Sequence, residues 1–533
     1  MNRRFRETSR AFAVIAFFVA SLVLRAPPAA AAIDYRISLA HPEQHLFHIT
    51  MMVPVEGREL LVALPVWNTL YQVRDFPYRV RDVTGICPAV DGAPLDVRKL
   101  DKQTWRISLR TPCQPGDHNR FEVHYAIEWN DPGPFNSQLN EHHAFLNLAE
   151  VLMYVPDRRA EDSDVAFDDL PATWQIAAEL PAAHDTYSFS AASYDALVDA
   201  PVEAGNFAAF EFDSGGAHLR ALIDGSASGE SRLEDYLRRI TAYELQLMGG
   251  APFDTPRKEY TFIFHIGSYA EVGGGGMEHA NSTAISAQSI EGAAAIAAHE
   301  FFHAWNVKRI RPQSLEPVDY TKEQFTRALW FAEGVTSAYA SFTLERAGVW
   351  TKDRFYDDLA NQVCELESRP ARKWQSLEES SLDAWFEKYD AYNSPDRSIS
   401  YYDKGQILGV LLDLSIRDAT DNRKSLDDVM RLMNQQYAHQ GKFYNDSDGV
   451  RAAVEQVSGK NFEDFFRKYV AGTDEIPYAD FFGVAGLELK IEPPPGVQSG
   501  ASDKTPRCWV SEISGANERQ RRIRDGILRG TND

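Results

Sequence analysis

The sequence predicts an α+β protein of several domains, in which an antiparallel β-sandwich-like domain precedes a mainly helical one. Its 533 residues exceed what one compact core usually holds. Short stretches rich in Val, Ile, Phe, Tyr and Thr, separated by Pro, Gly, Asp and Asn, dominate the N-terminal part. Apolar residues then recur with helical spacing in the second part. We therefore expect domains at residues 33–227 and 228–482, followed by a linker and tail at 483–533.

The first 32 residues resemble a secretory signal peptide. Four arginines lie within the first ten residues, the apolar run Ala11–Leu24 follows, and Ala30–Ala32 offers a small-residue cleavage site. The apolar run is too short for a permanent membrane span. An uncleaved N-terminal anchor is the alternative. We expect an exported protein, periplasmic or extracellular, with no stable membrane span after cleavage.

The net charge argues against a nucleic-acid-binding function. The whole chain carries a formal charge of −22, and loss of five arginines and one glutamate with residues 1–32 makes it −26. Nucleic-acid binding requires a basic surface. The acidic balance indicates a well-solvated surface and favours neutral or cationic substrates.

The four cysteines allow a disulfide but not a cysteine zinc site. No Cys-x-x-Cys pair occurs, which excludes a zinc ribbon. In an exported chain, Cys87 and Cys113 are candidates for a disulfide between neighbouring strands or loops.

The N-terminal domain is predicted from alternating apolar and polar residues in short stretches. No long helical period interrupts them. The pair His142-His143 is expected at the surface of this domain. The predicted strands are Leu46–Val53, Glu59–Leu64, Thr104–Leu109 and Arg120–Glu128.

The second domain begins with a helix and a strand. Arg232–Met248 carries apolar residues on one helical side, and Lys258–Ile266 alternates as a strand does. After the glycine-rich Gly273–Gly276, helices dominate to about Val470. This order predicts a mixed domain in which strands precede helices.

The strongest chemical motif is His299-Glu300-Phe301-Phe302-His303. Residues four apart lie on one helical face, so His299 and His303 can bind one metal ion. The residues around the motif are apolar, so this helix should be buried. Glu300 lies beside the imidazoles, where it can activate the attacking water. A buried His–Glu cluster without metal is the alternative.

A second apolar helix supplies the third ligand. We expect it to begin near Thr321, where Thr321 and Gln324 fit a capping box, and to include Leu329–Val335. Glu333 is the only charge in that apolar stretch. Two histidines and one glutamate leave a fourth position for water, as catalytic zinc sites require, so we expect one zinc ion per chain. A salt bridge from Glu333 to Arg309, Arg311 or Arg327 is the alternative.

A His-Glu-x-x-His motif with an open zinc position is typical of zinc peptidases, whose reaction needs one more group. Negative charge develops on the carbonyl oxygen during peptide hydrolysis, so a hydrogen-bond donor should face it. The best candidate is a tyrosine within Ser400–Gly405.

These residues together resemble the gluzincin zinc peptidases. His299–Pro312 is similar to the glycyl aminopeptidase family, metallopeptidase family sixty-one, and Glu333 lies in the Trp-x-x-Glu-Gly segment of that clan. Gly275–His279 resembles the family's counterpart of the exopeptidase motif Gly-x-Met-Glu-Asn, and Tyr402 occupies the tyrosine of Tyr-x-Lys-Gly. The resemblance covers about residues 34–490. It implies a thermolysin-like catalytic domain and removal of N-terminal Gly or Ala from peptides.

The resemblance also implies how substrate binds. Gly275, Gly276 and Met277 would present their backbone to an extended peptide with a free N-terminus, and Glu278 would pair with its α-ammonium group. The family usually ends in a PDZ domain, whereas this tail matches only a truncated PDZ-like module. Two other functions stay open: a zinc endopeptidase of the same fold, and a non-catalytic peptide-binding scaffold. The sequence gives no oligomeric state.

Overall fold

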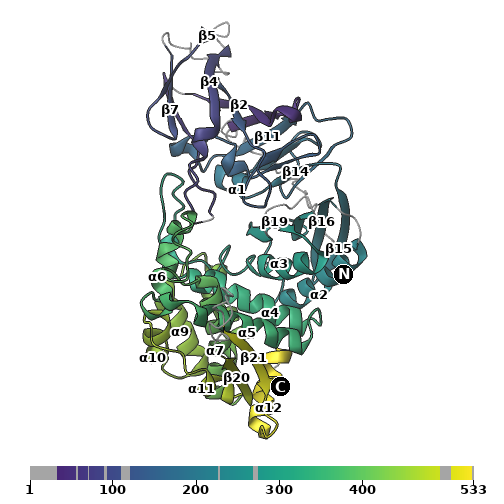
Figure 1. The fold of residues 1–533 in the computed structure, drawn as a ribbon. Helices are drawn as coiled ribbons and strands as arrows, with labels where there is room; N and C mark the ends of the chain where they lie inside the picture. Colours follow the sequence, from purple (N-terminus) through teal and green to yellow (C-terminus); the bar gives the residue numbers. More distant parts are fainter. Residues whose placement is uncertain are drawn as a thin grey trace, which may run out of the picture.

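The protein consists of an N-terminal β domain and a larger catalytic domain rich in helices (Figure 1). The β domain, purple and blue in the figure, lies at the top, and the green helical part lies below it. The expected α+β architecture is therefore confirmed. The computed structural model describes residues 33–55, 58–69, 71–88, 93–109, 120–225, 229–267, 274–492 and 506–530.

A seven-stranded sheet forms the centre of the β domain. Its order is β13-β11-β1-β2-β8-β4-β5, and every neighbouring pair is antiparallel except β1 with β11. Alternate residues of β2, including Phe47, Ile49 and Met51, are buried, so one face of the strand packs into the core. The strands are β1 (Ile33–Ser38), β2 (Leu46–Pro54), β4 (Val80–Cys87), β5 (Ala93–Pro94), β8 (Arg120–Glu128), β11 (Ser163–Asp168) and β13 (Ser188–Ala191).

Two smaller sheets complete this domain. One has the order β3-β7-β6, and the other has the order β12-β14-β10-β9. The second lies against the catalytic domain, because its Phe145 and Ala177 share an apolar cluster with Leu222 and Ile263. The elements are β3 (Glu59–Ala63), β6 (Asp96–Lys99), β7 (Thr104–Ser108), β9 (Gln138–Leu139), β10 (His143–Leu146), β12 (Gln175–Ala178), β14 (Val202–Gly205) and the short helix α1 (Tyr194–Val198).

The catalytic domain is built on a five-stranded sheet of order β15-β16-β17-β19-β18. β15 and β16 precede the boundary expected at residue 227, yet β16 pairs in parallel with β17, so the catalytic sheet begins at Ala208. β18 lies at the edge of the sheet and pairs only with β19 among the described strands. The strands are β15 (Ala208–Ser214), β16 (Ala217–Gly225), β17 (Glu259–Ile266), β18 (Gly275–Glu278) and β19 (Ser282–Ala287).

Helices cover this sheet and enclose the largest apolar core of the molecule. Four alanines of α3 between Ala293 and Ala298 are fully buried, and such small side chains let α2 and α4 pack closely against this helix. The helices are α2 (Glu230–Met248), α3 (Ile290–Phe302), α4 (Thr336–Arg346), α5 (Lys352–Ser368), α6 (Leu377–Leu382), α7 (Tyr401–Thr420), α8 (Leu426–Gln436), α9 (Asp446–Ser458), α10 (Glu463–Phe465), α11 (Tyr478–Gly483) and two π-helical segments, η7 (Trp330–Val335) and η11 (Phe466–Val470). None of the helices in the described part of the chain is long and apolar enough to cross a membrane.

The described part of the tail packs against the catalytic domain. Ile523 and Ile527 belong to the catalytic core, and Arg346 of α4 donates to the carbonyl of Ile527. A disulfide joins Cys364 of α5 to Cys508. The tail elements, yellow in Figure 1, are β20 (Leu487–Glu492), β21 (Arg507–Glu512) and α12 (Glu518–Arg529). The PDZ-like character of the tail stays a prediction.

Two expectations fall on residues outside the described ranges. Cys113 lies outside them, so its pairing with Cys87 stays a prediction. The signal peptide at residues 1–32 also lies outside them.

Candidate active site

Helix α3 brings His299 and His303 onto one face. Ser289 caps its start by accepting a hydrogen bond from the backbone N–H of Gly292, and His303 lies at its C-terminal end. The Nε2 atoms of the two histidines are 2.9 Å apart. Both imidazoles therefore point to one place, as the sequence predicts from their spacing of four residues.

Glu333 reaches the same place from η7, a π-helical segment that continues into α4. Its Oε2 is 3.4 Å from His299 Nε2 and 3.2 Å from His303 Nε2. The helix begins at Leu329, not near Thr321 as the sequence suggests. Thr321 and Gln324 instead hydrogen-bond to Asp319 and the preceding loop, so they form no capping box.

The outer nitrogens of both imidazoles have partners that fix the proton positions. His303 Nδ1 is 2.7 Å from the carbonyl oxygen of Asn306, which can only accept, so Nδ1 carries the proton. Ser337 donates to the carbonyl of Glu333, and its oxygen lies 3.3 Å from His299 Nδ1, where it accepts. Both Nε2 atoms therefore present lone pairs to the carboxylate. Ser337 was missed from the sequence, although it lies one helical turn after Glu333.

This donor set fits a metal ion. Donors about 2.0–2.2 Å from a tetrahedral zinc ion lie a little over 3 Å apart, close to the three separations seen here. Two lone pairs and a carboxylate without a proton between them need a cation at their centre. Without an ion, protons on the imidazoles would take that place: although burial raises the pKa of Glu333, positively charged His303 and His299 hold it well below its ordinary value.

The three arginines considered as alternative partners of Glu333 contact other groups. Arg309 donates to the carbonyls of Ala280 and Ala304. Arg311 pairs with Glu316, and Arg327 lies nearest Glu378. The salt-bridge interpretation of Glu333 is therefore wrong.

Two further contacts fix the ligand segments relative to each other. The side-chain amide of Asn306 donates to the carbonyl of Phe331 and to the hydroxyl of Thr336, which ties the end of α3 to η7. Gly334 of η7 lies directly against Gly405 of α7, where an added Cβ on Gly334 would come within 2.5 Å of the Gly405 Cα. This close approach brings Tyr402 beside the ligands.

Glu300 is positioned by a glycine of the edge strand. Its Oε2 is buried without a hydrogen-bond partner among the described residues. A Cβ on Gly276 would lie 2.4 Å from Glu300 Cγ and Oε1, so only glycine leaves room for this side chain. Burial raises the pKa of the Glu300 carboxyl well above its ordinary value.

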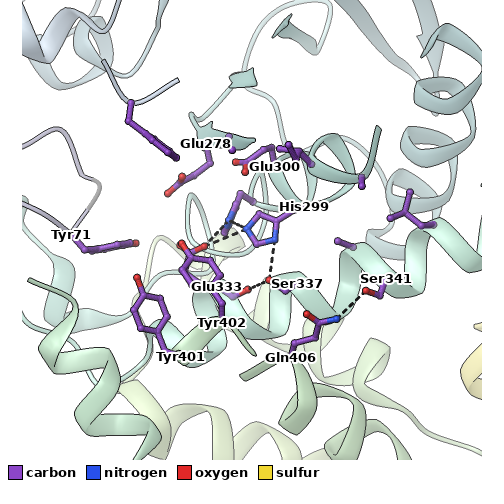
Figure 2. A pocket seen from close by; sticks show the side chains of 18 of the residues that line it. Tyr71, Glu278, His299, Glu300, Glu333, Ser337, Ser341, Tyr401, Tyr402 and Gln406 are labelled. Carbon is purple, nitrogen blue, oxygen red and sulfur yellow. Dashed lines mark hydrogen bonds and ion pairs between the residues drawn. The ribbon is translucent and has the colours of Figure 1, made fainter. Parts of the chain in front are cut away.

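The edge strand β18 borders a cavity of about 530 Å³. His299, His303 and Glu333, which together form the candidate metal-binding face, also line this cavity. Gly275, Gly276 and Glu278 line it, whereas Met277 is buried on the opposite side. Carboxylate oxygens of Glu278 and Glu300 and a nitrogen of His303 lie within 4.8 Å of one another. Figure 2 shows Glu278 and Glu300 above His299, with Glu333 below it.

Aromatic side chains from both domains close the other side of the cavity. Tyr402 lines the cavity with its ring centroid 6.2 Å from that of His299, and the residue is 38% exposed. Tyr401 packs on Tyr402, and Tyr71 comes from the β domain (Figure 2). The sequence did not identify Tyr71, because no local pattern relates it to residues of the other domain.

Comparisons with solved structures show related folds. An aminopeptidase N family protein from Idiomarina loihiensis has a TM-score of 0.79 and 25% identity, over 89% of this chain and 82% of its own. An M1 zinc metallopeptidase from Deinococcus radiodurans has a TM-score of 0.51 and 15% identity, over 84% of this chain and 95% of its own. A comparison with curated proteins gave no match.

Comparison with protein families assigns both domains consistently. The M61 glycyl aminopeptidase domain matches residues 293–408, which include the metal-binding face and Tyr402. The peptidase M61 N-terminal domain matches residues 34–206. Together the two matches cover more than half of the chain. The chain belongs to the M61 glycyl aminopeptidase family and is a peptide-bond hydrolase of the aminopeptidase type.

Proposed function

We propose that this protein is an exported zinc aminopeptidase that removes small N-terminal residues, Gly or Ala, from peptides. The observation that carries the proposal is the position of Glu278. Its carboxylate lies on an edge strand, within 4.8 Å of Glu300 and His303. A peptide whose α-ammonium pairs with Glu278 has its first peptide bond close to the metal-binding face, which makes the enzyme an exopeptidase.

Each residue has a separate role in the proposed reaction. His299, His303 and Glu333 would hold one zinc ion, which would lower the pKa of water toward about 7 and polarise the scissile carbonyl. Glu300 accepts the proton of the attacking water at its unpartnered carboxylate and transfers it to the leaving amine. Tyr402 donates its hydroxyl to the carbonyl oxygen as negative charge develops there.

The edge of the catalytic sheet supports binding of an extended peptide. β18 has a free edge among the described strands, and Gly275 and Gly276 leave its backbone open to the cavity. A substrate can add there as a further strand, with main-chain hydrogen bonds that depend little on sequence. Glu278 lines this part of the cavity, where its carboxylate would favour a cationic N-terminus.

The aromatic side chains support a preference for small first residues. Tyr71 and Tyr401 lie on the side of the cavity next to Glu278 and Glu333 (Figure 2). Both are buried, so neither moves aside without disturbing its packing. A first residue with a long side chain would compete with these rings for space.

Export agrees with the cysteine chemistry. The Cys364–Cys508 disulfide is of a kind that forms and persists outside the cytosol. Secretion through a cleaved signal at residues 1–32 would deliver the chain to such a compartment.

The test measures zinc content and hydrolysis of Gly, Ala, Leu and Phe 4-nitroanilides by residues 33–533, each with and without N-acetylation. We expect chelator-sensitive hydrolysis, fastest for Gly and Ala, and no hydrolysis of the acetylated substrates. Replacing Glu278 by Gln should lower kcat/KM for Ala anilide by about 10- to 100-fold, because a charged hydrogen bond is lost.

Other outcomes would redirect the proposal. Cleavage of acetylated peptides at internal bonds would identify an endopeptidase. A zinc-loaded protein that binds peptides and cleaves none would be a scaffold. Equal rates with Gly and Leu anilides would remove the proposed size limit and leave the exopeptidase intact.

A further inference from the structure

A second cluster of metal-ligating side chains lies where the β domain meets the catalytic sheet. His143 of β10 and Glu203 of β14 come from the β domain, and His265 of β17 and Asp224 of β16 come from the catalytic sheet. Ligand atoms of the two histidines and Glu203 all lie within 4.8 Å of one another. The expectation of a surface position for His143 is wrong, because its side chain is 0% exposed.

The strand pairings explain why these residues meet. Asp224 and His265 are direct partners across β16 and β17. His143 and Glu203 lie on the antiparallel pair β10 and β14. The rings of His143 and His265 are 5.2 Å apart between centroids, so the two sheets meet at this point.

The separations between the ligand atoms suit a metal ion. His143 Nδ1 is 3.0 Å from Glu203 Oε1 and 3.5 Å from Asp224 Oδ2. His265 Nε2 is 3.0 Å from Glu203 Oε2. Donors at about 2.0–2.2 Å from one ion are separated by about 3.0–3.5 Å.

An outer hydrogen bond orients His143 as a ligand. The side-chain oxygen of Gln138 is 3.1 Å from His143 Nε2, and the Gln138 amide nitrogen donates to Asn130. This second bond fixes the Gln138 amide with its oxygen toward the ring, so Nε2 carries a proton. His143 Nδ1 then faces the two carboxylates. Metal-binding histidines commonly have such a partner on the outer nitrogen.

The charges of the cluster also call for a cation. Glu203 is 1% exposed and Asp224 is 17% exposed at the side chain, and neither pairs with a lysine or arginine of the described chain. One buried and one partly buried carboxylate need two compensating positive charges. One divalent ion with two neutral imidazoles provides them, and so do two protons on the imidazoles.

We propose that His143, Glu203, His265 and Asp224 form a second metal site, which binds a divalent transition-metal ion and joins the β domain to the catalytic sheet. Two imidazoles with carboxylates suit zinc and its neighbours in the first transition row. The ligands come from four strands, and none of them lines the catalytic cavity. The site is structural in character because protein groups fill its coordination positions. Asp224, the most exposed member, provides the entry side.

The first experiment counts metal by mass spectrometry in the full chain after exposure to Zn²⁺ and dialysis. Wild type should hold two zinc ions per chain. His299→Ala should lower the count to one, and His265→Gln should also lower it to one while retaining peptidase activity. His184→Ala, which removes a histidine whose side chain is 82% exposed, should leave both ions in place.

The second experiment keeps the proposal testable if His265→Gln does not fold. In the His299→Ala protein, Zn²⁺ should raise the thermal midpoint and EDTA should lower it. Anomalous diffraction at the zinc edge should place a peak between His143 and Glu203. One zinc per wild-type chain, all of it lost in His299→Ala, would overturn the proposal and show that protons occupy the cluster. Loss of peptidase activity alone would bear on the proposed function and not on this site.

Discussion

Replacement of Gly276 by alanine tests how Glu300, the proposed general base, is positioned. The added Cβ would lie 2.4 Å from Glu300 Cγ and Oε1. Carbon atoms in contact are ordinarily about 3.5–4.0 Å apart, so the side chain of Glu300 must move by more than about 1 Å. A displacement of this size costs on the order of 10²-fold in rate. We expect kcat for Ala 4-nitroanilide to fall by about that factor while zinc content stays unchanged.

The matched control for this variant is Gly274→Ala. A Cβ at Gly274 meets only ordinary contacts, at 3.5 Å from Ile296 and 3.7 Å from Ser286, so this variant should retain wild-type activity. Steady-state kinetics separates the effects, because a shifted β18 would raise KM whereas a displaced Glu300 lowers kcat. A zinc-loaded Gly276→Ala enzyme with kcat within about threefold of wild type would refute the reasoning.

Three further predictions follow from the geometry. Glu300→Gln should retain zinc and lose about 10²–10⁴-fold in kcat by anilide assay, and an active variant would rule out Glu300 as the base. Gly405→Ala would place a Cβ 2.5 Å from the Trp330 carbonyl oxygen and should cost about 1–3 kcal/mol in thermal unfolding, whereas Gly483→Ala, with nothing within 4 Å, should cost little. Reduction of Cys364–Cys508, whose loop spans 144 residues, should lower the midpoint of wild type more than that of Cys508→Ser.

The sequence predicted most accurately what depends on local geometry. His299 and His303 meet because four residues make about one helical turn, and that relation holds wherever the helix lies. Glu333 is the only charge in an apolar stretch, which the sequence shows directly. A buried charge needs a partner, so the sequence marks Glu333 as a candidate ligand. Strands such as β2 and β8 showed their period of two directly.

The sequence misses two contacts between distant segments and misjudges one local contact. His143 looks like half of a surface pair, yet it faces His265 from another domain. Cys508 is bonded to Cys364 because the tail packs on α5, which no local pattern shows. Thr321 and Gln324 fit a capping box in sequence, but both side chains form hydrogen bonds with Asp319 instead.

The position of Glu333 combines both kinds of information. Its identification as a candidate ligand follows from composition, whereas its distance from His299 depends on the hydrogen bonds of Asn306 that tie the end of α3 to η7. The contact of η7 with α7 in turn places Tyr402 beside them. That contact requires two glycines: an added Cβ on Gly334 would lie 2.6 Å from the Tyr401 carbonyl oxygen, and one on Gly405 would lie 2.5 Å from that of Trp330. Gly405, the glycine of the Tyr-x-Lys-Gly motif that begins at Tyr402, therefore acts through packing. It lets α7 approach η7 closely enough to bring Tyr402, on the first turn of α7, beside His299, so in the proposed mechanism the tyrosine and this glycine form one structural unit.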